Sequence, residues 1–124
     1  MIEAEKKHLN DDYKRIFLGG FSQGSGVSLH IRSILPYEIG GTVLIGGFKS
    51  DFTEIKPNAD FSNLLIIHGT DDDTIKLDDA KKMYKDLMEK PGVETCFIEG
   101  MEHNLYRSDM RRRIAEFLKK RAKD

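Results

Sequence analysis

Four short apolar runs alternate with helical patterns along the chain, and this alternation constrains the fold more than any other feature. The runs cover residues 15–19, 41–46, 64–68 and 94–98. Each run is bounded by Gly, Pro, Asn or charged residues, which is typical of strands buried on both faces of a sheet. Strands that alternate with helices pair in parallel through right-handed crossovers. The pattern therefore predicts an α/β fold in three layers, with about four parallel strands between flanking helices.

Apolar residues recur at helical spacing in three segments outside these runs. The first segment begins after Ser22 and stops at Pro36, the second ends at Pro91, and the third lies near the C-terminus. A further short helix is expected within residues 1–12. The apolar positions of the three segments are Val27, Ile31 and Leu35; Leu77, Ala80, Met83, Tyr84, Leu87 and Met88; and Met110, Ile114, Phe117 and Leu118.

Composition narrows the class of protein. With 124 residues, 39% hydrophobic and 33% charged, the chain suits one globular domain over residues 1–124. The 20 Lys and Arg residues against 21 Asp and Glu residues argue against nucleic acid as a partner. Cys96 is the single cysteine, so no intrachain disulfide is expected. We expect a cytoplasmic location and no integral membrane segment, because the start is charged and no apolar run approaches ~18 residues.

The segment Gly20-Phe21-Ser22-Gln23-Gly24 lies between the first apolar run and the first helical pattern. G-x-S-x-G in a strand–turn–helix context is typical of a sharp turn that exposes a nucleophilic serine. Small residues at Gly20 and Gly24 would avoid clashes around a strained Ser22. The turn also places the backbone N–H of Gln23 at a helix N-terminus, where negative charge is favoured. The structural alternative is a glycine-rich turn with a capping serine.

Acidic and basic partners for such a serine follow two later apolar runs. Asp71, Asp72 and Asp73 come after the third run, and His103 comes after the fourth. A serine nucleophile needs a base, and the base needs a carboxylate that orients it. The chain order Ser, Asp, His is that of α/β-hydrolases, and parallel strands bring their carboxyl ends to one edge. We therefore expect the three groups to converge there.

Each of these groups also has a structural interpretation. The three aspartates suit a polar loop with a helix cap, and a loop histidine is commonly solvated. A metal site is less favoured, because the aspartates lack the glycine and distal glutamate of a calcium-binding loop. His68, at the end of the third run, is expected to be a structural residue.

Three motifs together resemble the phospholipase/carboxylesterase family of α/β-hydrolases, which includes acyl-protein thioesterases and small bacterial carboxylesterases. They are Gly19-Gly20-Phe21-Ser22-Gln23-Gly24, His68-Gly69-Thr70-Asp71-Asp72 and Glu99-Gly100-Met101-Glu102-His103. The resemblance extends from about Arg15 to the last helix. It implies that Ser22 is the nucleophile, His103 the base and Asp72 the acid, with the Gln23 N–H in the oxyanion hole. Asp73 stands where the family commonly has proline.

The resemblance implies a serine hydrolase that cleaves small acyl esters or thioesters through an acyl-enzyme, with no metal or organic cofactor. A lysophospholipase-like activity is the alternative within hydrolases. The first half of the family domain, with a second oxyanion donor, has no counterpart in residues 1–14. We therefore expect a truncated, partial domain whose serine-bearing strand lies at a sheet edge.

An exposed apolar strand tends to recruit another chain. We therefore expect either a homodimer or pairing with the missing half through this strand. The alternative function is a catalytically weak hydrolase that serves as an interaction or oligomerisation module. The missing half favours that alternative, whereas the intact Ser22, Asp72 and His103 favour the enzyme.

Overall fold

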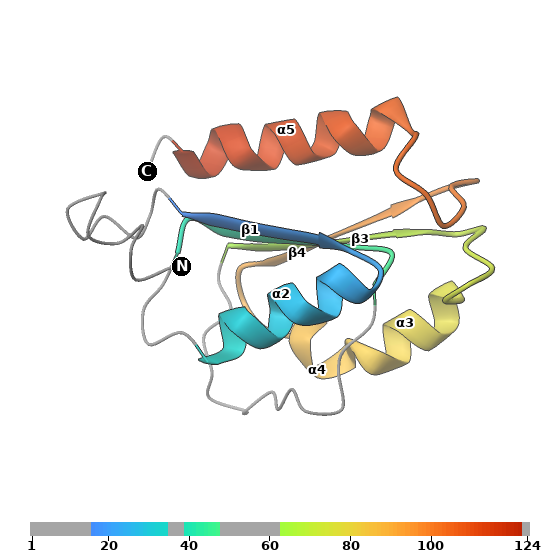
Figure 1. Cartoon of the computed structure of the whole chain (residues 1–124), viewed down its shortest axis with the longest axis horizontal. Helices are drawn as coiled ribbons and strands as arrows, with labels where there is room; N and C mark the ends of the chain where they lie inside the picture. The colour runs from blue at the N-terminus through green and yellow to red at the C-terminus, as the bar shows by residue number, and fades with distance from the viewer. Residues whose placement is uncertain (1–15, 35–38, 48–62, 123–124) are drawn as a thin grey trace.

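The computed structural model describes residues 16–34, 39–47 and 63–122 (Figure 1). The helix expected within residues 1–12, and Leu35 of the first helical pattern, lie outside the described residues. The described part follows the predicted alternation of strands and helices.

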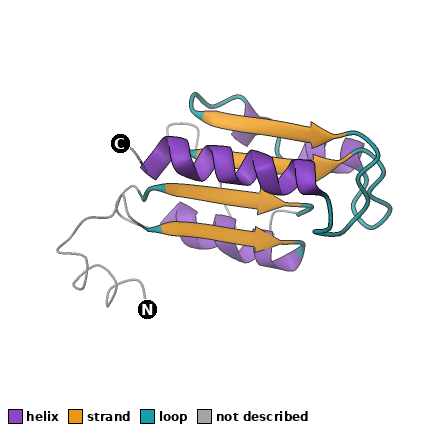
Figure 2. Cartoon of the chain, turned by 90° about the horizontal axis from the view of Figure 1, so that it is seen from above, coloured by secondary structure: helices purple, strands orange, loops and turns teal. Residues whose placement is uncertain are grey.

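Four parallel strands form one sheet in the order β1-β2-β3-β4. The strands are β1 (Phe17–Phe21), β2 (Gly41–Ile45), β3 (Leu64–Gly69) and β4 (Val93–Ile98). In the register of the sheet, Thr42 lies beside Leu64, and Leu64 lies beside Val93. All four carboxyl ends therefore lie at the same edge of the sheet, as the arrows in Figure 2 show. The predicted parallel sheet is confirmed.

Helices cover both faces of this sheet (Figures 1 and 2). The long helix α5 (Ser108–Ala122) crosses one face. The other face is covered by α2 (Gln23–Ile34), α3 (Leu77–Met83) and α4 (Lys85–Met88). The predicted three-layer arrangement is therefore confirmed. None of the described helices has the length and apolar character that crossing a bilayer requires.

The first strand lies later in the sequence than predicted. It was expected over residues 15–19, but β1 pairs with β2 from Phe17 beside Gly41 to Phe21 beside Ile45. Glycine commonly interrupts a strand, so the pattern suggested that the strand ended at Gly19. In the structure both glycines belong to the strand, and the absent side chain of Gly20 admits the backbone of Gly24 in α2. The strand therefore runs directly into Ser22.

The second helical pattern forms two helices rather than one. The break is at Tyr84, where φ is −96° and ψ is 8°. The amide of Tyr84 still bonds to the Ala80 carbonyl at 2.9 Å, and the Met88 amide bonds to the Tyr84 carbonyl at 2.8 Å. The apolar stripe therefore keeps facing the sheet across the break. Burial raises the pKa of Tyr84 to about 12, with a small opposing effect from Ser25, so the phenol stays neutral.

The core consists of two apolar layers, one on each face of the sheet. Alternate residues of β3 serve the two layers, because successive side chains of a strand point to opposite faces. The layer under α5 contains Val43, Ile45, Leu65, Ile67, Ile98, Met101, Met110 and Phe117. The other layer contains Leu29, Leu44, Leu64, Ile66, Tyr84 and Leu87. Strands β2 and β3 are wholly buried, whereas β1 and β4 are mainly half-buried edges.

Phe117 fixes α5 against the sheet, and its removal tests that layer. Its side chain is fully buried, and a Cβ atom at Gly41 would lie only 2.8 Å from its ring. We expect Phe117→Ala to lower the free energy of unfolding by about 3–5 kcal/mol, measured by urea denaturation. The control Lys119→Ala, on the exposed side of α5, should change it by less than about 0.5 kcal/mol. Equal losses in the two variants would contradict this packing.

Candidate active site

Ser22 occupies a sharp turn between β1 and α2. Its φ of +57° lies in the left-handed region, which is uncommon for residues other than glycine. The Ser22 N–H donates to the Ile45 carbonyl at 2.9 Å. The Ser22 carbonyl accepts bonds from the Ser25 N–H at 3.0 Å and the Ser25 hydroxyl at 2.6 Å. These bonds hold the turn from both sides, so the unusual backbone conformation persists.

The two glycines of the turn differ in what they allow. A Cβ atom at Gly20 would lie 2.1 Å from the Gly24 carbonyl oxygen, so no side chain fits there. A Cβ atom at Gly24 would meet nothing within 4 Å. The expectation that both positions must be small is therefore wrong for Gly24. A side chain at Gly20 would overlap the backbone of Gly24, whereas a side chain at Gly24 would meet no neighbour. Only Gly20 must therefore lack a side chain.

The His103 imidazole lies between the Ser22 hydroxyl and the Asp72 carboxylate. Its Nε2 is 3.0 Å from Ser22 Oγ, and its Nδ1 is 2.7 Å from Asp72 Oδ2. An ionised carboxylate only accepts hydrogen bonds, so Nδ1 carries the proton that is donated to Asp72. Nε2 is then left to accept the proton of the Ser22 hydroxyl. The Phe21 ring packs on the imidazole with centroids 4.8 Å apart.

Asp72 is held by the turn that follows it. Its Oδ1 accepts the N–H groups of Thr74 at 2.9 Å and Ile75 at 2.8 Å, while Oδ2 faces His103. The Asp72 side chain is only 1% exposed, whereas Asp71 and Asp73 are exposed. Of the three aspartates, Asp72 alone makes a described contact with His103. The turn thus presents one oxygen to its own backbone and the other to the imidazole.

Two glycines after β2, which the sequence analysis did not single out, make room for these groups. A Cβ atom at Gly46 would lie 3.3 Å from His103 Nδ1, and Gly46 has a φ of +53°. A Cβ atom at Gly47 would lie 1.4 Å from Ser25 Oγ. The signal was available as a glycine pair directly after a buried strand, since glycine there often marks close backbone approach.

Gly69 brings the two later loops together. A Cβ atom at Gly69 would lie 2.0 Å from the Met101 carbonyl oxygen, so the loop that carries His103 lies directly against it. The same Met101 carbonyl accepts the Asp71 N–H at 3.0 Å. The glycine of the His-Gly-Thr-Asp segment thus permits the contact that places His103 near Asp72.

Gln23 is the first residue of α2 and follows Ser22 directly. The first backbone N–H groups of a helix have no partner within the helix and point toward its positive end. The Gln23 N–H therefore lies where an oxyanion formed next to Ser22 could bind.

The family comparison adds to this geometry. A family model described as Phospholipase/Carboxylesterase matches residues 1–122. The chain belongs to this family.

Among known relatives, acyl-protein thioesterase 1 of Saccharomyces cerevisiae is 31% identical over 114 residues, covering 86% of this chain and 50% of the relative. The Candida albicans acyl-protein thioesterase 1 is 32% identical over 114 residues, covering 84% and 48%. The chain thus spans about half the length of the curated relatives it matches.

Solved structures of other proteins have folds similar to that of this chain. Arabidopsis thaliana SOBER1 matches with a TM-score of 0.79 at 19% identity, covering 98% of this chain and 60% of that chain. The Pyrococcus furiosus esterase Pf2001 matches with a TM-score of 0.69 at 22% identity, covering 96% and 60%. The chain therefore has an α/β-hydrolase fold.

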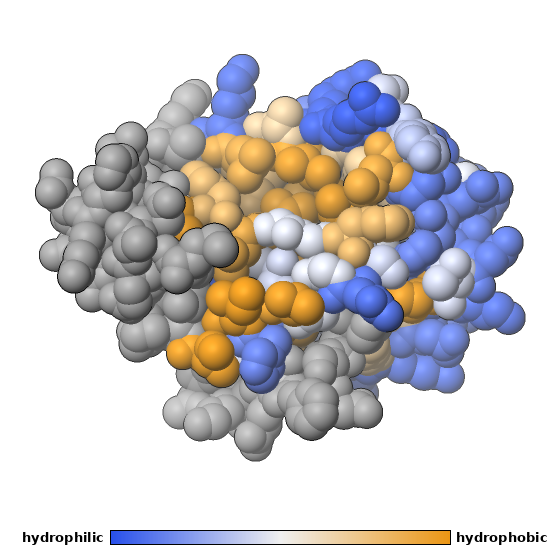
Figure 3. All heavy atoms as spheres, in the orientation of Figure 1, coloured by the Kyte–Doolittle hydropathy of each residue, from blue (hydrophilic) through white to orange (hydrophobic). Residues whose placement is uncertain are grey.

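Asp72 lines one hollow, and Phe21, whose ring packs on His103, lines a second. One, of about 510 Å³, is mostly acidic and is lined by Thr70, Asp71, Asp72, Asp73, Lys76, Leu77, Asp78 and Glu102. The other, of about 360 Å³, is mostly apolar and follows β1, with Phe21 and Leu105 in its lining. Figure 3 shows apolar side chains gathered on the face of the molecule that carries β1 and α5. No group of side chains suited to hold a metal ion is found among the described residues.

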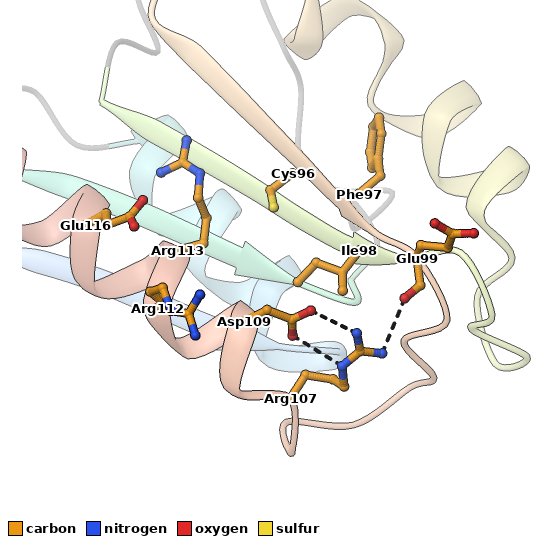
Figure 4. Close-up of a pocket in the computed structure, with 9 residues that line it drawn as sticks. All are labelled: Cys96, Phe97, Ile98, Glu99, Arg107, Asp109, Arg112, Arg113 and Glu116. Carbon is orange, nitrogen blue, oxygen red and sulfur yellow. Dashed lines mark hydrogen bonds and ion pairs between the residues drawn. The ribbon is translucent and has the colours of Figure 1, made fainter.

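A third hollow, of about 550 Å³, lies between β4 and α5 and contains none of the three aligned groups (Figure 4). Arg107 donates there to both carboxylate oxygens of Asp109, at 2.8 and 3.2 Å, and to the Glu99 carbonyl at 3.3 Å. The bonds from Arg107 lower the pKa of Asp109. Burial raises the pKa of the Cys96 thiol in the same hollow, so this thiol stays protonated. Arg107 and Asp109 thus form an ion pair at this hollow, while Arg113 pairs with Glu94.

The Gly20–Gly24 contact provides a matched test of the turn. We expect Gly20→Ala to destabilise the fold by about 1–3 kcal/mol, because the new methyl group overlaps the Gly24 carbonyl. Gly24→Ala should be neutral or stabilising by up to about 1 kcal/mol, since alanine favours helix and meets no neighbour. Urea denaturation of both variants measures the difference. Similar losses in both would show that the turn is crowded on both sides.

Proposed function

We propose that this chain carries the reacting groups of a serine hydrolase that cleaves carboxylic esters or thioesters. The observation that carries the proposal is the pair of His103 contacts, 3.0 Å to Ser22 Oγ and 2.7 Å to Asp72 Oδ2. The family, and relatives named as acyl-protein thioesterases and esterases, support this substrate class. In this proposal residues 1–124 act as one partial domain.

In the first half of the reaction, Ser22 Oγ attacks the acyl carbon while its proton passes to His103 Nε2. The Asp72 carboxylate stabilises the imidazolium through the Nδ1–H bond. The oxyanion accepts the Gln23 N–H at the positive end of α2. When the tetrahedral intermediate collapses, the C–O or C–S bond breaks, and His103 gives its proton to the leaving alcohol or thiol. Ser22 is left acylated.

In the second half, a water molecule takes the place of the leaving group. His103 Nε2 removes a proton from this water as its oxygen attacks the acyl carbon. Collapse of the second intermediate breaks the bond to Ser22 Oγ, which recovers the proton from His103. The acid is released and the starting state is restored. In family members a second oxyanion donor is expected from the first half of the domain, and one such donor contributes about 10²–10³ in kcat.

Covalent labelling tests the proposed nucleophile. We expect a fluorophosphonate probe to label wild-type chain at Ser22 and to leave Ser22→Ala unlabelled. Ser108→Ala, which removes an exposed hydroxyl at the start of α5, should label like wild type. Asp72→Asn should lower the rate of labelling on the order of 10⁴-fold, because the imidazole loses the tautomer that accepts the serine proton. Labelling that persists in Ser22→Ala would overturn the assignment.

Substrate comparison then separates the chemical classes. Rates with short-chain esters, acyl-thioesters and lysophospholipids distinguish a carboxylesterase, a thioesterase and a lysophospholipase. Hydrolysis of none of the three, with Ser22 unlabelled, would favour the alternative function described next.

A second candidate function, an interaction or oligomerisation module, is favoured by the edge strand β1. Among the described strands β1 pairs on one side only, with β2. The apolar hollow runs along this strand and includes Phe17 and Leu18 in its lining. Unpaired strand edges of apolar character recruit further strands. We propose that this edge pairs with a second copy or with the half of the family domain that residues 1–124 do not span.

Light scattering at tens of micromolar tests this pairing. We expect a mass above the 14.2 kDa of one chain. Leu18→Lys should reduce it toward a single chain, because the new charge opposes burial of the edge. Val27→Lys, at a position on α2 that is 59% exposed, serves as the control and should leave the mass unchanged. A wild-type chain that is monomeric would refute the proposal that β1 pairs with a second copy.

A further inference from the structure

His68 is a buried imidazole that the proposed mechanism does not use. It is the fifth residue of β3 and lies four positions before Asp72. Its side chain is 1% exposed. The sequence suggested only that it ends a strand, but the structure connects it to the carboxylate that faces His103.

The tautomer of His68 follows from its partner. Nε2 lies 2.6 Å from the Ile75 carbonyl oxygen, which can only accept, so Nε2 carries a proton and donates it. Nδ1 is buried without a hydrogen-bond partner among the described residues. His68 is therefore a hydrogen-bond donor at Nε2, and the Ile75 carbonyl fixes the orientation of its ring.

Ile75 links this donor to Asp72. The Ile75 carbonyl accepts from His68, and the Ile75 N–H donates to Asp72 Oδ1 at 2.8 Å. His68 Nε2 also lies 3.5 Å from Asp72 Oδ2, the oxygen that accepts the His103 proton. The imidazole of His68 thus faces both the turn that holds one carboxylate oxygen and the other oxygen itself.

We propose that His68 is a positioning residue that keeps Asp72 Oδ2 aimed at His103, an inference that rests on the proposed serine-hydrolase mechanism. By fixing the Ile75 carbonyl, His68 fixes the turn whose amides hold Oδ1. The carboxylate then has no freedom to rotate away from the imidazole. A carboxylate held in place in this way accelerates the reaction more than a carboxylate that must be ordered during each turnover.

Two substitutions at His68 separate the hydrogen bond from the bulk of the side chain. His68→Leu removes the donor and keeps an apolar side chain in the site. His68→Gln places an amide N–H the same number of bonds from the backbone as Nε2, so it can still donate to Ile75. Asp72→Asn provides the reference for a lost Asp72–His103 contact. Chemical denaturation confirms that each chain is folded.

The split between kcat and KM gives a measure that a general structural loss would not reproduce. For His68→Leu we expect kcat to fall on the order of 10²-fold with KM unchanged, because Asp72 Oδ2 is no longer held toward His103 during the reaction. His68→Gln should restore kcat. The other charged groups around the Asp72 loop stay the same in all variants; they are Asp71, Asp73, Lys76, Asp78 and Glu102.

Proton NMR separates failure of this inference from failure of the proposed function, because it needs no turnover. We expect a far-downfield signal from His103 Nδ1–H in wild type and in His68→Gln, and its loss in His68→Leu. This pattern would support the positioning role even if no ester were hydrolysed. A wild-type NMR signal and a wild-type kcat in His68→Leu would overturn it, as would a rise in KM with kcat unchanged. If His68→Leu does not fold, His68→Asn, whose amide overlies Nδ1 instead of Nε2, gives the same comparison.

Discussion

The parallel pairing of β1 to β4 is the constraint on which the rest of the molecule depends. Because all four strands run the same way, the segments that follow them leave the sheet at one edge. Ser22 follows β1, the Asp72 loop follows β3, and the His103 loop follows β4. The wholly buried β2 and β3 keep this edge rigid, because their side chains pack against helices on both faces. Reversal of β1, β3 or β4 would carry one of these groups to the opposite edge.

Much of the fold and the candidate site could be predicted from sequence because the relevant signals are local. Each buried strand is a short apolar run, and Ser22, Asp72 and His103 each lie just beyond such a run. The order of the three residues along the chain, Ser then Asp then His, is a further signal that no single residue provides. Residue types alone left Asp71, Asp72 and Asp73 open, and the resemblance to the family indicated Asp72. The structure adds the contact itself, with Asp72 Oδ2 at 2.7 Å from His103 Nδ1.

The features that the sequence analysis missed arise from contacts between distant segments. Gly46 and Gly47 are small because of His103 and Ser25, which lie far from them in the chain. The G-x-S-x-G pattern treats its two glycines alike, whereas packing restricts only Gly20. The break at Tyr84 leaves the apolar stripe intact, so hydrophobic spacing alone contains no sign of it.

The sheet is also ordered along the chain, since each strand pairs with the strand that precedes it in sequence. Each parallel pairing still requires a crossover segment, so the sheet forms more slowly than one built from local hairpins. During synthesis β1 emerges before β2, β3 and β4. His103 lies beyond the last strand, so the imidazole is the final member of the group to be made. A chain synthesised only through β4 would hold Ser22 and Asp72 without the His103 imidazole that lies between them in the structure.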